Sequence, residues 1–257
     1  MKLNKIDIYN FILDKLTTVL KFKSNNSKYN PKIVFDSILY LLKSNVSWNS
    51  KIILNNIIIC TNAIYKHFSF LTSINFFEKI LKSINTKFFK QDINNSYYNS
   101  IDSIFIANKC CSTKYKNLKR NKYKSNKFGF KLSIITNSYN IPIDILFANG
   151  NNHDITIFRQ QFNKPIVQKF LKNKLFLADK GYKSKELEKQ LKENNTTILL
   201  PKANDKTYKK RIYIEHLFAR LKNYKRISFV YEKFLPSFKS FCFLAFICLY
   251  ITGYIKA

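Results

Sequence analysis

The sequence is short of acidic residues. Its 257 residues contain 15 Asp and Glu residues against 45 Lys and Arg residues, which gives a formal net charge of +30. Only five of the basic residues are Arg, and the abundance of Asn and Ile indicates an AT-rich coding bias that favours Lys. The same bias favours Asp and Glu, so the deficit of acids is real and fits a polyanionic partner, most simply nucleic acid. The alternative is a basic protein whose charge only keeps it soluble.

Cysteine pairs are also missing. The chain has an odd number of cysteines, five, and none of them forms a C-x-x-C pair. This pattern argues against a zinc site and against a disulfide framework, and it favours a reducing compartment. The five residues are Cys60, Cys110, Cys111, Cys242 and Cys248.

Long apolar runs are absent as well. The first 16 residues, "MKLNKIDIYNFILDKL", contain no uninterrupted apolar core, so they do not read as a signal peptide. The stretch "FCFLAFICLYITGYI", residues 241–255, is short for a bilayer span and fits a buried terminal helix, with a membrane anchor as the alternative. An apolar content of 46% still supports a packed core and excludes a disordered chain.

Residues 1–90 are predicted to form a helical domain. Asn30 is positioned as an N-cap, with Pro31 at the first helical position. Short helices with tight polar breaks are compatible with a helix-turn-helix that binds DNA, and equally with a plain helical bundle. In the first case residues 61–71 form the recognition helix, with Lys66 and His67 facing outward. The expected helices cover residues 5–22, 30–44, 49–60, 61–71 and 75–85.

A polar segment, residues 91–100, is predicted to be a linker, and the period of the pattern changes after it. Residues 101–257 show three strands, a helix, a strand, a helix, a strand and a helix. This order predicts an α/β domain with a mixed sheet flanked by helices. The expected strands are residues 100–108, 128–137, 141–149, 174–179 and 196–201, and the expected helices are residues 154–162, 184–194 and 208–226.

The last of these helices, "YKKRIYIEHLFARLKNYKR", has a polar edge in addition to its apolar face. Tyr208, Arg211, Glu215 and Lys222 are separated by 3, 4 and 7 residues. With about 100° of rotation per residue, these four side chains fall in one narrow stripe of the helix.

Three carboxylates stand at positions where chemistry is expected. Asp102 interrupts an apolar strand, Asp179 ends the strand "LFLAD", and Glu215 projects from the late helix. A polar group within an apolar strand needs a partner, and ligand sites gather at strand ends. Three acids close together require a cation, and an oxygen-only set suggests Mg²⁺ or Mn²⁺. Two such ions can activate a nucleophile and stabilise a leaving oxygen in phosphoryl transfer.

Each carboxylate also has a purely structural interpretation. Asp102 could cap a bulge, Asp179 could be a turn residue, and Glu215 could pair with Arg211 one turn away. Two further acids compete for a functional role, because Asp144 lies on a strand and Asp154 is positioned to cap a helix.

The spacing of the late stripe resembles a family signature. Tyr208, Arg211, Glu215 and Lys222 match the pattern Y-x2-R-x3-E-x6-K of DDE-type insertion-sequence transposases, in the superfamily of insertion sequences four and five. "LADKGYKS" resembles the family's middle signature and contains Asp179, and "IDSI" resembles its first and contains Asp102. The hairpin "GFKLSIITNSYNIPI" and the segment "ANGNNHD" are similar too.

The resemblance implies a ribonuclease H-like fold for the second domain and a DDE transposase activity. Asp102, Asp179 and Glu215 would be the catalytic metal ligands for two Mg²⁺ or Mn²⁺ ions, while Tyr208, Arg211 and Lys222 would contact DNA phosphates. The implied partners are double-stranded DNA, namely the inverted repeats of the element and its target, and a second copy in a homodimer or higher multimer. The implied location is the cytoplasm at the nucleoid, or the nucleus of a eukaryotic host.

Two departures from the family pattern keep alternatives open. Ile104 replaces the usual threonine after the first acid, and the hairpin turn "NSYN" lacks the usual acidic and glycine residues. Neither change removes a carboxylate. The alternatives are a decayed or domesticated copy that only binds DNA, and a related metal-dependent nuclease.

Overall fold

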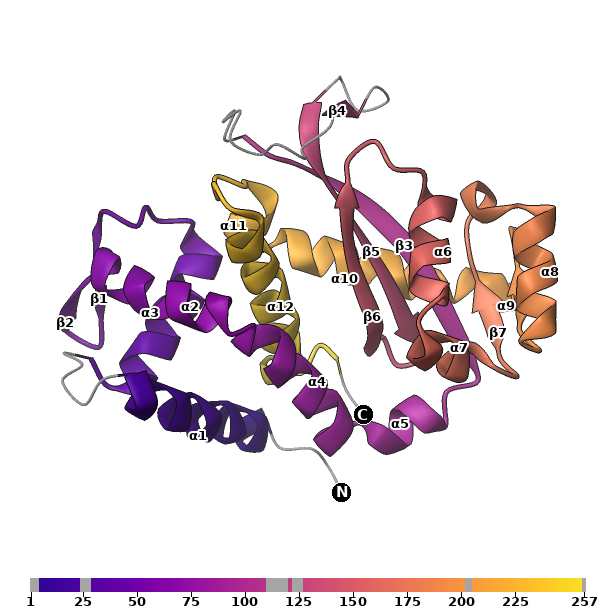
Figure 1. The fold of residues 1–257 in the computed structure, drawn as a ribbon. Helices are drawn as coiled ribbons and strands as arrows, with labels where there is room; N and C mark the ends of the chain where they lie inside the picture. Colours follow the sequence, from indigo (N-terminus) through magenta and orange to yellow (C-terminus); the bar gives the residue numbers. More distant parts are fainter. Residues whose placement is uncertain (1–4, 24–28, 110–119, 122–126, 202–204, 256–257) are drawn as a thin grey trace. The chain divides into compact units, whose positions relative to one another are not determined.

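The chain forms two compact units. One unit comprises residues 1–88 together with residues 221–256, and the other comprises residues 89–220. The computed structural model describes residues 5–23, 29–109, 120–121, 127–201 and 205–255 (Figure 1). The sequence division near residue 90 assigned everything beyond residue 100 to the sheet domain. In the structure, residues 221–256 instead group with the N-terminal helices.

The first unit is mainly helical. Helix α2 begins as its sequence predicts: the side chain of Asn30 accepts a hydrogen bond from the backbone N–H of Ile33, and Pro31 is the first helical residue. The unit contains α1 (Lys5–Lys23), α2 (Pro31–Ser44), β1 (Lys51–Leu54), β2 (Ile57–Cys60), α3 (Thr61–Ser73), α4 (Phe76–Phe88), α11 (Lys225–Ser228) and α12 (Leu235–Ile251).

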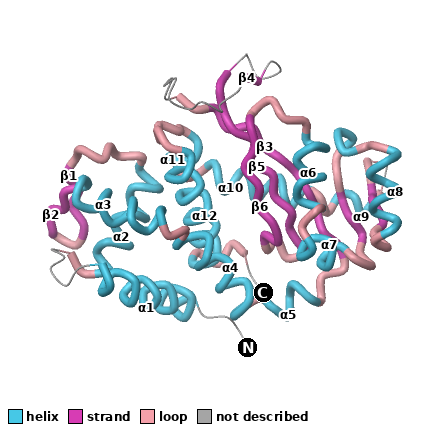
Figure 2. Tube along the Cα trace, viewed as in Figure 1, coloured by secondary structure: helices cyan, strands magenta, loops and turns pink. Residues whose placement is uncertain are grey.

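A β-hairpin replaces one expected helix. Residues 49–60 were predicted to be helical, and this is wrong: β1 and β2 pair antiparallel, with Leu54 opposite Ile57 (Figure 2). The two residues between the strands, Asn55 and Asn56, have φ values of 49° and 62°. A two-residue turn of this type needs positive φ at both positions, which Asn tolerates, and the β-branched isoleucines on either side favour strands.

Helix α12 is the core of the first unit. Its residues from Ser240 to Tyr250 are all buried, which is the pattern of a helix surrounded by other elements. Phe241 stacks on Phe68 of α3 with ring centroids 4.4 Å apart, and Trp48 packs against both rings. Within the described ranges, no helix combines the length and apolarity needed to cross a membrane.

The predicted absence of a disulfide framework can be examined at three cysteines. Cys60, Cys242 and Cys248 are free thiols, and the two in α12 are buried. Cys110 and Cys111 lie outside the described residues.

A buried ion pair lies beside this aromatic cluster. Arg226 is 4% exposed and Glu232 is 7% exposed, and the Nε of Arg226 donates to the Oε1 of Glu232 at 2.8 Å. The guanidinium lies 4.6 Å from the centroid of Trp48 and 4.7 Å from that of Phe241, within cation–π range. Its Nη1 also donates to the backbone carbonyl of Val46 at 2.7 Å. The charge is therefore compensated on several sides.

The second unit contains the mixed sheet that its sequence predicts. Five of the six strands of this sheet lie in the order β6–β5–β3–β7–β8. The sixth, β4, pairs with the first residues of β5. Strands β6, β5 and β3 are antiparallel neighbours, whereas β3, β7 and β8 are parallel. The α/β, ribonuclease H-like fold class is confirmed. The strands are β3 (Tyr98–Ala107), β4 (Arg120–Asn121), β5 (Lys127–Asn137), β6 (Pro142–Asn149), β7 (Leu175–Leu177) and β8 (Thr197–Leu199).

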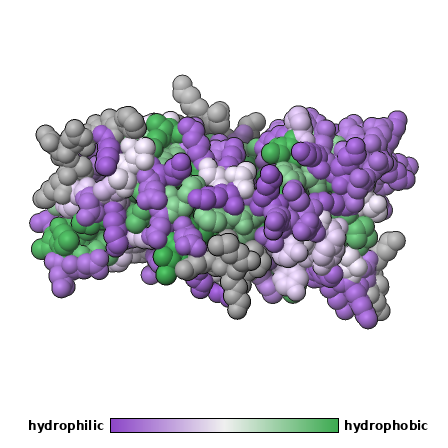
Figure 3. Space-filling view, turned by 90° about the horizontal axis from the view of Figure 1, so that it is seen from below, coloured by the Kyte–Doolittle hydropathy of each residue, from purple (hydrophilic) through white to green (hydrophobic). Residues whose placement is uncertain are grey.

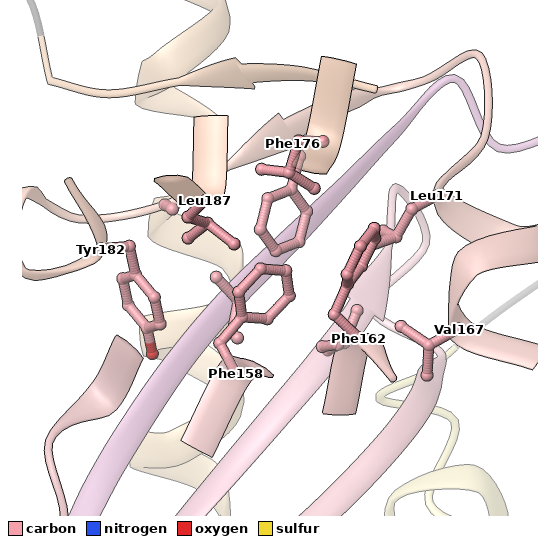
Figure 4. Close-up of a cluster of buried hydrophobic side chains, with 11 residues drawn as sticks. Phe158, Phe162, Val167, Leu171, Phe176, Tyr182 and Leu187 are labelled. Carbon is pink, nitrogen blue, oxygen red and sulfur yellow. The ribbon is translucent and has the colours of Figure 1, made fainter. Parts of the chain in front are cut away.

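Helices cover a face of this sheet through an apolar cluster (Figure 4). Phe158 stacks on Phe176 at 4.9 Å and meets the ring of Tyr182 edge-on at 6.2 Å. The covering elements are α6 (Asp154–Phe162), α7 (Pro165–Leu171), the 3₁₀ turn η1 (Lys180–Tyr182) and α8 (Lys185–Glu193). The predicted linker, residues 91–100, is not simply a connector, because it contains most of α5 (Lys90–Asn94) and the start of β3.

The late stretch forms three helices, where the sequence predicted one long helix. They are α9 (Lys206–Lys209), α10 (Ile212–Lys222) and α11. Between α9 and α10 the backbone bonds span three residues instead of four: the N–H of Arg211 donates to the carbonyl of Tyr208 at 2.9 Å. Arg211 therefore lies in a turn between two helices.

Candidate active site

Asp102 and Asp179 are brought together by neighbouring parallel strands. In the β3–β7 register, Ser100 lies opposite Leu177. Asp102 and Asp179 each lie two residues further on, so they come level at the carboxyl end of β7. The Oδ1 of Asp102 accepts from the N–H of Ser103 at 2.9 Å, and the Oδ1 of Asp179 accepts from the N–H of Lys180 at 2.7 Å, where it caps η1.

Glu215 is connected to this pair of acids through Arg211. The Nη1 of Arg211 lies 2.7 Å from the Oε1 of Glu215, and its Nη2 lies 2.9 Å from the Oδ2 of Asp102. Arg211 is 9% exposed, and the side chain of Asp102 is 22% exposed, while that of Glu215 is half-exposed. One guanidinium thus joins a carboxylate on β3 to a carboxylate on α10.

The charges of neighbouring groups act on the pKa values of Asp102 and Arg211. Burial raises the pKa of Asp102; Arg211 opposes this shift, while Glu215 and Asp179 add to it. Burial alone would lower the pKa of Arg211, but the charges of Asp102, Tyr208, Asp179 and Glu215 together raise it above its ordinary value. Glu215 and Asp179 therefore both lie close enough to influence Asp102 and Arg211.

The structural interpretation, in which Glu215 only pairs with Arg211, accounts for part of what the structure contains. Glu215 does pair with Arg211 one turn earlier, as an isolated helical pair would. However, Arg211 simultaneously binds Asp102, which lies more than 100 residues away in the sequence. The contact is therefore part of a tertiary cluster. Tyr208 belongs to it as well, because burial and the charges of Arg211, Asp179 and Glu215 all act on the pKa of its hydroxyl, which is raised.

The two competing acids have partners elsewhere. Asp144 pairs with Lys164 at 2.8 Å and accepts from Gln161. Asp154 pairs with Lys131 at 2.9 Å and accepts a hydrogen bond from the hydroxyl of Ser103. These contacts give both acids structural roles.

One residue near the site was not singled out from the sequence. Tyr182 is buried, and burial together with the charges of Asp154 and Asp102 raises the pKa of its hydroxyl. It stands three residues after Asp179 in the motif "LADKGYKS", so its position in the motif was the available signal.

The basic residues predicted to bind DNA lie in different elements. Lys222 is exposed at the end of α10, where the chain enters the first unit. Lys66 is exposed on α3, as expected for an outward residue, whereas His67 is half-buried.

The donor chemistry of the acids fits a hard divalent ion. Three carboxylates without Cys or His are the ligands that Mg²⁺ and Mn²⁺ prefer. Among the described residues, however, no three acidic, His or Cys side chains are arranged around a common metal position. The cation that Asp102 and Glu215 share here is Arg211.

Comparison with known families gives one match. A family model described as "Transposase DDE domain" matches residues 101–251, more than half of the chain. The matched range contains Asp102, Asp179 and Glu215, and it extends from the sheet through α12. No curated protein matches the chain.

Proposed function

The chain belongs to the transposase DDE domain family, and from this premise we propose that it is an insertion-sequence transposase of the insertion-sequence-four/five superfamily. In this proposal the protein cleaves DNA at the ends of its own element and joins the freed 3′-hydroxyls to target DNA. The observation that carries the proposal is that one guanidinium joins Asp102 to Glu215, with Asp179 level with Asp102 on the neighbouring strand, all within the matched range.

The three acids are proposed to be the catalytic residues. Asp102, in the middle of β3, and Asp179, just after the end of β7, each accept a hydrogen bond from a backbone N–H group and would hold Mg²⁺ or Mn²⁺ together with Glu215. Divalent ions bound there would supply Lewis-acid activation of water and charge stabilisation of the leaving oxygen. The protein's own contribution is to fix two of the carboxylates on a rigid sheet, so that their geometry is set before DNA binds.

Polar and basic side chains of the late stretch, residues 208–226, are proposed to position the DNA. Tyr208, Arg211 and Lys222 offer hydroxyl, guanidinium and ammonium donors to phosphate oxygens, which orients a strand without reading its sequence. The face of the molecule in Figure 3 is mostly hydrophilic, with apolar side chains gathered in separate patches. The net charge of +30 supports binding to phosphates.

The helical unit is proposed to bind the inverted repeats. It offers α3 with the exposed Lys66, followed by α4 after a two-residue connection, and the β1–β2 hairpin precedes α3. Any sequence preference would therefore involve α3 and its neighbouring hairpin. By analogy with the family, cleavage of two element ends would need two or more copies of the chain on DNA.

The function is tested by incubating the full-length protein with DNA that carries both flanks of its gene. We expect strand cleavage at the element ends and transfer to a target plasmid in Mg²⁺ or Mn²⁺, and neither reaction in a chelator, because the carboxylates need a divalent ion to act on phosphate. The products are resolved on denaturing gels with end-labelled DNA. Cleavage without joining would favour the nuclease alternative, and binding without cleavage would favour the DNA-binding alternative.

DNA binding should depend steeply on salt. The logarithm of the affinity is expected to fall linearly with the logarithm of the salt concentration, because each lysine that neutralises a phosphate releases counterions. Lys66→Ala should reduce the slope by about one, as expected for one lost phosphate contact. The control is Lys79→Ala, which removes an exposed lysine from α4. Equal slopes for these two variants would contradict a DNA contact by Lys66. The measurement is fluorescence anisotropy with an end duplex from about 50 to about 300 mM salt, a sixfold range that suffices for a slope.

A further inference from the structure

Arg211 binds two of the carboxylates that are proposed to hold the metal ions, Asp102 and Glu215. Its two terminal nitrogens bind oxygens of two different carboxylates, at 2.9 Å from Asp102 and 2.7 Å from Glu215. The negative charge of Asp179 also helps to raise the pKa of Arg211. Three acids that gather without a counterion would repel one another. The guanidinium therefore holds the acids together when no other cation is present.

A divalent ion would need the same two carboxylates, Asp102 and Glu215. A carboxylate oxygen that accepts a short bond from a guanidinium is not available as an unhindered metal ligand, and a guanidinium remains charged at any pH where the protein is folded. Binding of the ion next to Arg211 would also place like charges side by side. Metal and Arg211 are consequently in competition for Asp102 and Glu215.

Arg211 has a second class of ligand that suits it equally well. Guanidinium groups bind phosphate oxygens through paired N–H donors, as they bind carboxylates. Arg211 also lies in the turn between α9 and α10, outside both helices. Both contacts with the carboxylates are made by the side chain, so a change in its torsion angles can redirect the guanidinium while the backbone hydrogen bonds of Arg211 stay in place.

We propose that Arg211 is an exchangeable cation: it holds Asp102 and Glu215 in the metal-free protein and passes to a DNA phosphate when a divalent ion takes the carboxylates. DNA and metal then bind cooperatively, because each removes the competitor of the other. The proposal rests on the proposed function for the identity of the two ligands. The competition itself depends only on contacts within this chain.

The test measures Mn²⁺ binding to the full-length protein without DNA. The electron paramagnetic resonance signal of free Mn²⁺ reports how much of the metal remains unbound. Arg211→Gln should bind Mn²⁺ more tightly than the wild type by at least about tenfold, since it removes a positive charge held within 3 Å of the ligands. The matched control is Lys210→Gln. It removes the same charge from the preceding residue, whose Nζ contacts the hydroxyl of Tyr97 and not the acids.

If Arg211 has only a structural role, no gain in Mn²⁺ affinity is expected. If the guanidinium only stiffens the site, Arg211→Gln would bind Mn²⁺ no better than Lys210→Gln, and the exchange would be overturned. Asp102→Asn separates this failure from failure of the proposed metal site. If Asp102→Asn weakens Mn²⁺ binding while Arg211→Gln does not strengthen it, the metal site stands without the exchange. If Asp102→Asn binds Mn²⁺ as tightly as the wild type, the proposed metal site and the exchange are both overturned.

Two further measurements keep the result interpretable. Circular dichroism reports whether Arg211→Gln is folded without metal; if it is not, Arg211→Lys, which keeps the charge but loses the paired donors, should bind Mn²⁺ with intermediate affinity. A short duplex added with Ca²⁺ absent should tighten Mn²⁺ binding in the wild type more than in Arg211→Gln. Equal tightening in both proteins would show that DNA acts on the metal without Arg211 and would overturn the exchange.

Discussion

Strand cleavage by Glu215→Gln is expected to fall by about a hundredfold to a thousandfold, the scale seen when one charge-stabilising group is removed from an active site. The substitution keeps the size of the side chain but removes its charge and one of the carboxylates grouped with Arg211. DNA binding should remain nearly unchanged or become slightly tighter, because a negative charge near phosphate is lost. Cleavage is measured on labelled element ends in Mg²⁺ or Mn²⁺, and binding in Ca²⁺.

The matched control for this result is Glu186→Gln. Glu186 pairs with Arg159 on the surface of the same unit, and exposed pairs of this kind contribute about 0–1 kcal/mol to stability. If Glu215 were only a surface partner of Arg211, both variants would retain full cleavage. Cleavage surviving in Glu215→Gln would therefore remove Glu215 from the catalytic set.

Glu232→Ala is expected to lower the free energy of unfolding by about 3–5 kcal/mol, the cost of leaving one member of a buried ion pair without its partner. Arg226 would remain 96% buried beside Trp48 and Phe241 with its charge uncompensated on one side. Urea unfolding can be followed by the fluorescence of Trp48, the single tryptophan of the chain, which lies against the guanidinium.

Two comparisons define that result. Lys233→Ala changes the exposed neighbour of Glu232 and should alter the unfolding free energy by less than about 0.5 kcal/mol. The double variant Arg226→Met with Glu232→Leu should be far closer to the wild type than Glu232→Ala, because apolar replacement of both partners leaves no buried charge. A loss below about 1 kcal/mol in Glu232→Ala would mean that water reaches Arg226.

The elements that the sequence predicts well have strong local signals. Asn30 and Pro31 mark the start of α2 through capping chemistry, and the strands around Asp102 and Asp179 are apolar runs with turn residues after them. The hairpin at Asn55 and Asn56 also has a local signal, which the helical interpretation of residues 49–60 does not take into account. Two Asn residues between runs of β-branched residues favour a two-residue turn between strands.

Other features depend on tertiary packing, which local periodicity does not contain. A helical wheel places Arg211 and Glu215 on one stripe but assumes a continuous helix, so it misses the turn at Arg211 that lies between α9 and α10. The ion pair of Arg211 with Asp102 spans more than 100 residues and could not be inferred from spacing. The same holds for α12, whose uniform apolarity predicts burial but not which unit buries it.

The grouping of α12 with the N-terminal helices has a consequence for how the protein is made. Chains grow at about 5–20 residues per second, so synthesis of α12 begins roughly 7–30 s after that of α4, its neighbour in the core, is complete. During that interval the continuous segment of residues 89–220 can fold first. Helices α1 to α4 then keep part of their apolar surface exposed until α12 has been synthesised. A frameshift after residue 220 would therefore spare the sheet and leave the first helices without their core. Newly made chains of this protein should depend on chaperones mainly through the segment that is translated first.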